Sequence, residues 1–154
     1  MPSRLNNVRK TPNNFDLFKE AEISFARTHD TPFFSGYGNF DFMVDVHRIF
    51  RYFDMDENDP ASYNFETTDK YIANMIAAGV KPFFRLGASI EHQYKFGTLP
   101  PKDNAKWARI CEHIIRHYNE GWADGFHYDI EYWEIWNEPD TNYKLGNSPT
   151  WGVT

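Results

Sequence analysis

A short stretch near the end of the sequence combines residue types that could protonate the leaving group of a sugar. The segment from Tyr132 to Trp136 is rich in aromatic and β-branched residues and predicts a strand, which Pro139 ends because proline has no backbone N–H. Glu138 is therefore expected at the exit of a buried strand, where a carboxylate is costly unless the site uses it. With the Asn137 amide and the Trp136 indole beside it, Glu138 has the surroundings of a general acid. The alternative is that Glu138 caps the following loop or helix.

Two further polar residues lie near the end of an earlier predicted strand, at positions 23–29. Alternation puts Arg27 and His29 on one face of that strand, and Glu134 and Glu138 on one face of the later strand. If both faces point toward the same interior, Arg27 is expected to meet Glu134 and Glu138, and Arg85 could add a second counter-charge.

The elements that position these residues alternate between helix and strand. Helices are predicted from Phe15 to about Glu22, after a cap at 67–69, and after a cap at Asp103. Strands are predicted at 23–29, 80–86 and 133–138, and the stretch from Val44 to Phe50 favours a short extra strand. Helices that alternate with strands through short connections predict right-handed βαβ units and a parallel sheet.

Composition restricts the class of protein. The chain has 154 residues, 41% of them hydrophobic and 25% charged, which is ordinary for a globular domain. A net charge of −6 argues against nucleic acid or an anionic membrane as a partner. No apolar run is long enough to span a membrane and no signal peptide opens the chain. The single cysteine, Cys111, fits a reducing compartment, so a cytoplasmic location is expected.

Three weaker motifs point to structural roles. The acidic stretch from Asp54 to Pro60 lacks the glycine and the terminal glutamate of an EF-hand loop, so a solvated turn is expected. His113 and His117 have the i, i+4 spacing of a helical metal pair, but no third ligand is evident and no metal is expected. Cys111 lies within the apolar stripe of its predicted helix and is expected to be inert.

The motifs together resemble glycoside hydrolase family 39, the family of β-xylosidases and α-L-iduronidase. Trp136-Asn137-Glu138-Pro139 is similar to the acid/base motif of clan A retaining glycosidases, and Arg27-Thr28-His29 is similar to the family's Arg-X-His segment. The similarity extends over roughly residues 14 to 152. It implies an α/β fold, a (β/α)₈ TIM barrel of which this chain supplies strands two to four, and a carbohydrate substrate with no cofactor.

The resemblance also implies a role for each matched residue. Glu138 would be the general acid/base of a double displacement at an O-glycosidic bond, and Asn137 would hydrogen-bond the 2-hydroxyl of the sugar. His29 would bind sugar, unless it is a core histidine bonded to backbone. Arg27 would orient Asn137 and the nucleophile, unless it forms a structural ion pair. Trp136 would be a sugar platform, unless it only fills the core.

The family's nucleophile is a glutamate at the end of the seventh strand, and no residue of this chain matches it. A full (β/α)₈ barrel takes about 250 residues. Residues 1–154 are therefore expected to form one incomplete catalytic domain, inactive alone. Two alternatives remain open: a non-catalytic carbohydrate-binding protein, and a half-barrel that forms a homodimer through open sheet edges.

Overall fold

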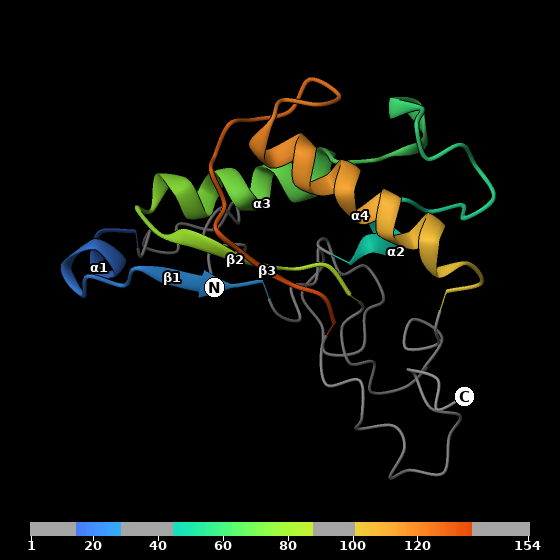
Figure 1. Cartoon of the computed structure of the whole chain (residues 1–154). Helices are drawn as coiled ribbons and strands as arrows, with labels where there is room; N and C mark the ends of the chain where they lie inside the picture. The colour runs from blue at the N-terminus through green and yellow to red at the C-terminus, as the bar shows by residue number, and fades with distance from the viewer. Residues whose placement is uncertain (1–14, 29–44, 88–100, 137–154) are drawn as a thin grey trace, which may run out of the picture.

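The computed structural model describes residues 15–28, 45–87 and 101–136. Helices and strands alternate along these segments (Figure 1). In chain order the elements are helix α1 (Phe15–Glu20), strand β1 (Phe25–Arg27), helix α2 (Val46–Ile49), the 3₁₀ turn η2 (Pro60–Ser62), helix α3 (Glu66–Ala77), strand β2 (Lys81–Arg85), helix α4 (Asn104–Asn119) and strand β3 (Tyr132–Glu134).

The three strands form one parallel sheet in the order β1-β2-β3, with β2 at its centre. Arg27 is in register with Phe83, and Arg85 is in register with Glu134. Since all strands run the same way, their carboxyl ends lie at one edge of the sheet. The predicted parallel βαβ order is thus confirmed. β1 and β2 are shorter at both ends than predicted, while β3 begins one residue before the predicted start at 133 and ends at Glu134.

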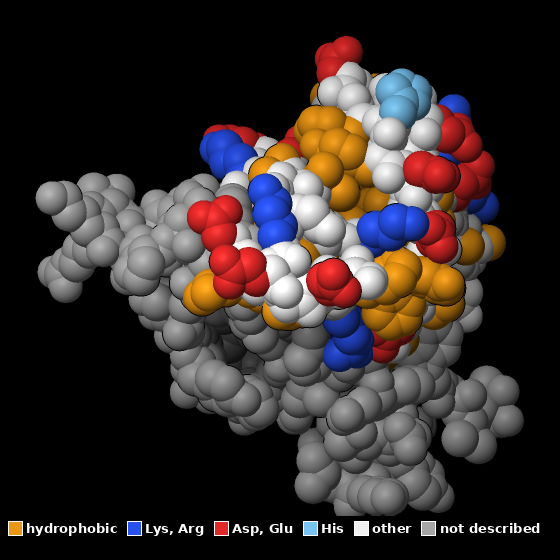
Figure 2. All heavy atoms as spheres, turned by 90° about the vertical axis from the view of Figure 1, so that its left-hand side faces the viewer, with side chains coloured by type: hydrophobic (Ala, Val, Ile, Leu, Met, Phe, Trp, Pro, Cys, Tyr) orange, Lys and Arg blue, Asp and Glu red, His pale blue; other side chains and the backbone are white. Residues whose placement is uncertain are grey.

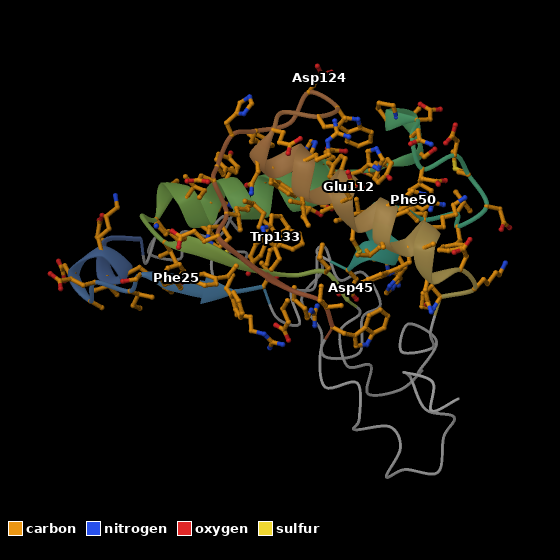
Figure 3. The ribbon with its side chains drawn as sticks, in the orientation of Figure 1. Phe25, Asp45, Phe50, Glu112, Asp124 and Trp133 are labelled. Carbon is orange, nitrogen blue, oxygen red and sulfur yellow. The ribbon has the colours of Figure 1, made fainter. Side chains whose placement is uncertain are left out.

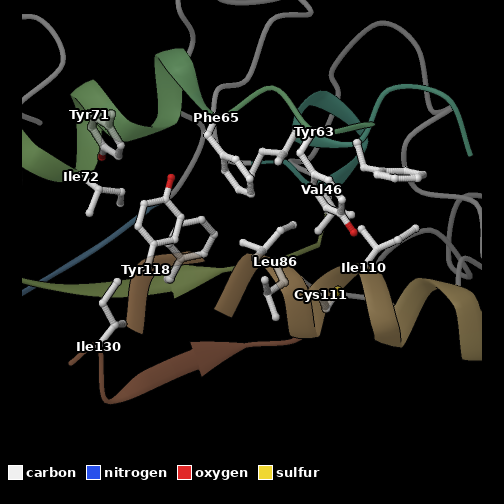
Figure 4. Packing of buried hydrophobic residues seen from close by; sticks show 14 of the residues in the cluster. Val46, Tyr63, Phe65, Tyr71, Ile72, Leu86, Ile110, Cys111, Tyr118 and Ile130 are labelled. Carbon is white, nitrogen blue, oxygen red and sulfur yellow. The ribbon is translucent and has the colours of Figure 1, made fainter. Parts of the chain in front are cut away.

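Helices α3 and α4 cover one face of the sheet, and the hydrophobic core lies between that face and the two helices (Figure 1). Phe84 is fully buried there, with Tyr118 of α4 at 5.5 Å and Trp133 of β3 at 5.0 Å between ring centroids. Figure 4 shows side chains of α2, α3 and α4 meeting Leu86, the residue after β2. The buried cluster includes Val46, Tyr63, Phe65, Tyr71, Ile72, Leu86, Ile110, Cys111, Tyr118 and Ile130.

The opposite face of the sheet carries aromatic rings at one end and charged groups at the other. Near the amino ends of the strands, Tyr132 packs edge-on against Phe25 and Phe83, at centroid distances of 5.3 and 5.8 Å. Figure 3 shows Phe25 at this end and Asp45 near the carboxyl ends. Seen from the side of α1, basic and acidic side chains are mixed with hydrophobic ones, without a field of one sign (Figure 2).

The predicted extra strand between Val44 and Phe50 is wrong: residues 46–49 form helix α2. The apolar residues Val46, Ile49 and Phe50 are spaced i, i+3, i+4, and all three are at least 95% buried. That spacing places them on one face of a helix, whereas a strand would have put Val46 and Ile49 on opposite faces.

The ends of the longer helices differ in how well the sequence indicated them. Helix α4 begins as predicted, because the Asp103 carboxylate accepts a hydrogen bond from the backbone N–H of Lys106 (3.0 Å). Helix α3 begins at Glu66, before the predicted cap at 67–69; there the Asn64 side chain accepts from the Glu66 N–H (3.3 Å). Gly79 follows α3 with φ +75°, a left-handed conformation that suits glycine.

The acidic stretch before η2 is only in part the solvated turn that was expected. Asp54 is exposed, but the Glu57 side chain is only 13% exposed and lies against α4. Its carboxylate accepts from Arg109 Nε (2.8 Å) and lies 3.4 Å from Lys106 Nζ. The Arg109 hydrogen bond is the main reason that the pKa of Glu57 is lowered to about 2.

Within residues 15–28, 45–87 and 101–136, no helix has the length and apolar character needed to cross a membrane.

Candidate active site at the carboxyl ends of the strands

The carboxyl ends of the three strands are joined by hydrogen bonds that continue past the strands themselves. Thr28 N–H donates to the Phe83 carbonyl (3.0 Å), and Leu86 N–H donates to the Glu134 carbonyl (2.8 Å). Val46 N–H donates to the Leu86 carbonyl (3.2 Å), so the start of α2 is attached to the end of β2. In barrels of alternating strands and helices, this is the edge at which active sites are built.

Arg27 and Glu134 form an ion pair across this edge. Arg27 Nε donates to Glu134 Oε2 (2.6 Å), and its Nη2 donates to Glu134 Oε1 (2.7 Å). A two-bond pair of this kind fixes the orientation of both groups. The side chains are 31% and 23% exposed. Alternation along the strands predicted that Arg27 meets Glu134, and this contact is confirmed.

A second ion pair at the same edge is buried. Arg85 Nη2 donates to Asp45 Oδ1 (2.7 Å), and the two side chains are 0% and 1% exposed. The backbone N–H of Arg85 donates to Thr28 Oγ1 (2.9 Å), which ties the end of β2 to the residue after β1. Strand alternation suggested that Arg85 is an interior counter-charge. Its carboxylate partner Asp45 was missed, because residue 45 was assigned to a strand and not to a helix cap.

His47 lies next to this buried pair and was not singled out from the sequence. Its Nε2 is 4.0 Å from Asp45 Oδ2, and its side chain is 38% exposed. Burial lowers the pKa of His47, against the opposing effect of the Asp45 carboxylate. A neutral imidazole can both donate and accept a hydrogen bond, which is the pattern that a hydroxyl group requires. No sequence motif marks this residue.

Trp136 is packed against the end of β2. A Cβ atom added at Gly87 would lie 2.6 Å from Trp136 Cδ2 and 2.7 Å from its Cα, so this approach requires glycine. The Trp136 ring also lies 5.7 Å from that of Trp107 on α4. These contacts account for Trp136 as a packing residue. Its predicted role as a sugar platform stays a prediction.

The histidines of α4 have structural partners. His117 Nδ1 lies 2.8 Å from the Trp122 carbonyl oxygen and its Nε2 lies 3.1 Å from Asp69 Oδ1, while its ring stacks on Phe65 at 3.6 Å. His113 Nδ1 lies 2.8 Å from the Arg109 carbonyl oxygen. In the part of the chain that the structure describes, no three metal-ligating side chains converge.

The remaining chemical candidate on α4 is its thiol. Cys111 is 5% exposed, and burial raises the pKa of its thiol, which makes it unreactive.

Three of the predicted site residues lie outside the described residues: Glu138, Asn137 and His29. Of the predicted set, Arg27 and Trp136 are described, and both lie at the carboxyl edge of the sheet. The described part of this edge therefore contains the ion pairs Arg27–Glu134 and Arg85–Asp45, the partly exposed His47, and Trp107 and Trp136.

Comparison with known proteins identifies relatives of this chain. The family model described as "Glycosyl hydrolases family 39" matches residues 23–146. A β-xylosidase of Caldicellulosiruptor saccharolyticus is 28% identical over 90 residues, which cover 51% of this chain and 18% of that protein. A β-xylosidase of Geobacillus stearothermophilus is 28% identical over 103 residues, 60% of this chain and 20% of that protein. The chain thus spans about a fifth of the length of these relatives.

A solved structure supports the fold. The crystal structure of a glucosidase from Croceicoccus marinus matches with a TM-score of 0.64 and 26% identity, covering 86% of this chain and 26% of that one. Together with the parallel β1-β2-β3 sheet and its helices on one face, this match identifies the described region as part of a (β/α)₈ barrel. The predicted fold class is confirmed.

Proposed function

Since this chain belongs to glycosyl hydrolases family 39, we propose that it is part of a retaining glycosidase that cleaves O-glycosidic bonds by double displacement. The observation that carries the proposal is the family match over residues 23–146, which includes the whole described carboxyl edge of the sheet and the Trp136-Asn137-Glu138-Pro139 motif. The two relatives described as β-xylosidases favour a xyloside as substrate.

The proposed chemistry gives Glu138 two proton transfers and gives Asn137, His29 and Trp136 contacts with the sugar. Glu138 protonates the departing oxygen while a second carboxylate, supplied from outside residues 1–154, attacks the sugar. Glu138 then removes a proton from the water that hydrolyses the glycosyl-enzyme. Asn137 hydrogen-bonds the 2-hydroxyl, a contact that strengthens in the transition state. His29 binds the sugar, and Trp136 forms one wall of the site.

Arg27 has a more specific role in this proposal than sugar binding. Two of its donors are held by Glu134, so its guanidinium is fixed on the interior side of the sheet. From there it would orient Asn137 and the nucleophile. The domain of residues 1–154 would then supply the acid/base half of the site, and the nucleophile half would complete the barrel.

Leaving-group dependence tests the role of Glu138. The protein is expressed at the full length that its gene encodes and assayed on aryl β-xylosides and β-glucosides, with and without Glu138→Gln. The variant should lose most activity on phenyl xyloside, whose leaving group needs a proton. It should still form the glycosyl-enzyme from dinitrophenyl xyloside, whose leaving group does not. Equal loss on both substrates would contradict the acid/base role.

The same assay separates the proposal from its alternative. Sugar binding without turnover by the unmodified protein would favour a non-catalytic carbohydrate-binding protein.

A further inference from the structure

The Arg27–Glu134 pair joins two strands that are not neighbours. β1 and β3 are separated by β2, and adjacent strands lie about 4.8 Å apart, so the pair bridges a gap of about 10 Å. Two hydrogen bonds, of 2.6 and 2.7 Å, join the Arg27 guanidinium to the Glu134 carboxylate. The ion pair therefore crosses the interior face of β2 and connects β1 directly to β3.

The ion pair involves the residue at which β3 ends. Glu134 is the last residue of β3, and its carbonyl oxygen accepts from Leu86 N–H (2.8 Å). Its backbone is thus fixed to β2 while its side chain is fixed to β1. Two residues later, Trp136 packs on Gly87, and the acid/base motif begins there.

The pair can contribute both to stability and to geometry. The side chains are 31% and 23% exposed; exposed ion pairs contribute about 1 kcal/mol or less to folding, and more where an arginine and a carboxylate share two hydrogen bonds as here, so stability must be measured beside kcat. Geometry matters for the reaction because a displacement of about 1 Å in a catalytic group can cost about a hundredfold in rate. An arginine that orients reacting groups needs its guanidinium held in one orientation, and the two hydrogen bonds to Glu134 hold it so.

We propose that Glu134 is a positioning residue of the glycosidase site, which acts by holding Arg27 in the orientation that the reaction needs. The inference rests on the proposed function. Glu134 does not touch the sugar in this scheme, so its loss should lower kcat and leave KM nearly unchanged.

Glu131, the residue before β3, offers a matched control. Its Oε1 pairs with Lys81 Nζ of β2 at 2.5 Å, at the amino end of the sheet. Glu134→Gln should lower kcat about tenfold or more, while Glu131→Gln should change it by less than about twofold. Glu134→Asp keeps the charge with a shorter reach and should recover part of the loss. Thermal denaturation of each variant checks that the folded fraction is equal.

A double-mutant cycle tests whether Glu134 acts through Arg27. If it does, Arg27→Lys with Glu134→Gln should be no slower than the slower single variant. Additive losses would overturn the inference, as would equal kcat values for the Glu134→Gln and Glu131→Gln proteins.

The outcomes separate the two levels of the proposal. Turnover that depends on Glu138 but not on Glu134 would remove the positioning role and leave the proposed function standing. No turnover by the unmodified protein on any of the glycosides would overturn both.

Discussion

Removal of the Asp45 carboxylate should destabilise the protein more than the loss of any exposed ion pair. Arg85 and Asp45 are 0% and 1% exposed and are joined at 2.7 Å. Asp45→Ala removes the Asp45 carboxylate from the buried Arg85 charge, and loss of one partner of a buried ion pair typically costs about 3–5 kcal/mol. The Asp45 side chain makes no capping hydrogen bond to α2, so the loss of a helix cap does not add to this cost.

Urea unfolding followed by tryptophan fluorescence measures this cost. With a denaturant slope of about 2 kcal/mol/M, a loss of about 3–5 kcal/mol lowers the midpoint by about 1.5–2.5 M. Glu131→Gln is the control, because its pair with Lys81 is 44% and 62% exposed, and its midpoint should hardly move.

The double variant Asp45→Leu with Arg85→Met distinguishes the cost of a buried charge that has lost the Asp45 carboxylate from the cost of a general packing defect. Replacement of a whole buried ion pair by apolar side chains is often neutral or stabilising. We therefore expect the double variant to recover most of the stability that Asp45→Ala loses. The reasoning is refuted if Asp45→Ala unfolds at the same urea concentration as Glu131→Gln, or if the double variant is as unstable as the single one.

Three other substitutions test local features of the fold by the same urea measurement. Gly125→Ala would place a Cβ against the His117 carbonyl oxygen and 2.7 Å from its Nδ1, so we expect a loss of about 1–3 kcal/mol or more, from steric overlap. Gly79→Ala would place a Cβ 3.7 Å from Lys19 Cγ, an ordinary van der Waals contact, but keeps φ +75°, so about 1 kcal/mol of strain is expected; a larger loss than at Gly125 would contradict this order. The lowered pKa of Glu57, about 2 in place of 4.5, contributes stability that is present above pH 4.5 and is lost as the pH falls toward 2. Glu57→Gln should flatten that acid limb, and an unchanged limb would show that other carboxylates cause it.

The sequence predicted the elements of the sheet well, because their signals are local. Helix α4 was recognisable from the Asp103 cap and one apolar stripe, and β2 from a run of apolar residues between Gly79 and Gly87. The parallel order followed from the alternation of these elements. Strand lengths were overestimated because hydrogen bonds that end a strand depend on its neighbours, not on its own residues.

The contacts of the candidate site were predictable only where strand periodicity determines them. Arg27 and Glu134 were expected to meet because both lie on the interior face of their strands. Asp45 was not expected beside Arg85, since the chain between Thr28 and Asp45 gives no local signal of where α2 will lie. Asp45 before Val46, Ile49 and Phe50 is a helix pattern of only one turn, and so short a pattern was read as a strand.

The two arginines of the interior face differ in burial, and this difference explains why each has its own kind of partner. Arg85 is completely inaccessible, so its charge needs a carboxylate that is equally buried, and Asp45 is brought in by α2 from outside the sheet. Arg27 retains 31% exposure, so water can solvate part of its charge, and under the proposed positioning role its pair with Glu134 mainly fixes the direction of the guanidinium. Loss of the first pair should therefore appear mainly in stability, and loss of the second mainly in kcat. Under the proposed function, the residues that support the fold at this edge of the sheet are therefore not those that orient the reacting groups.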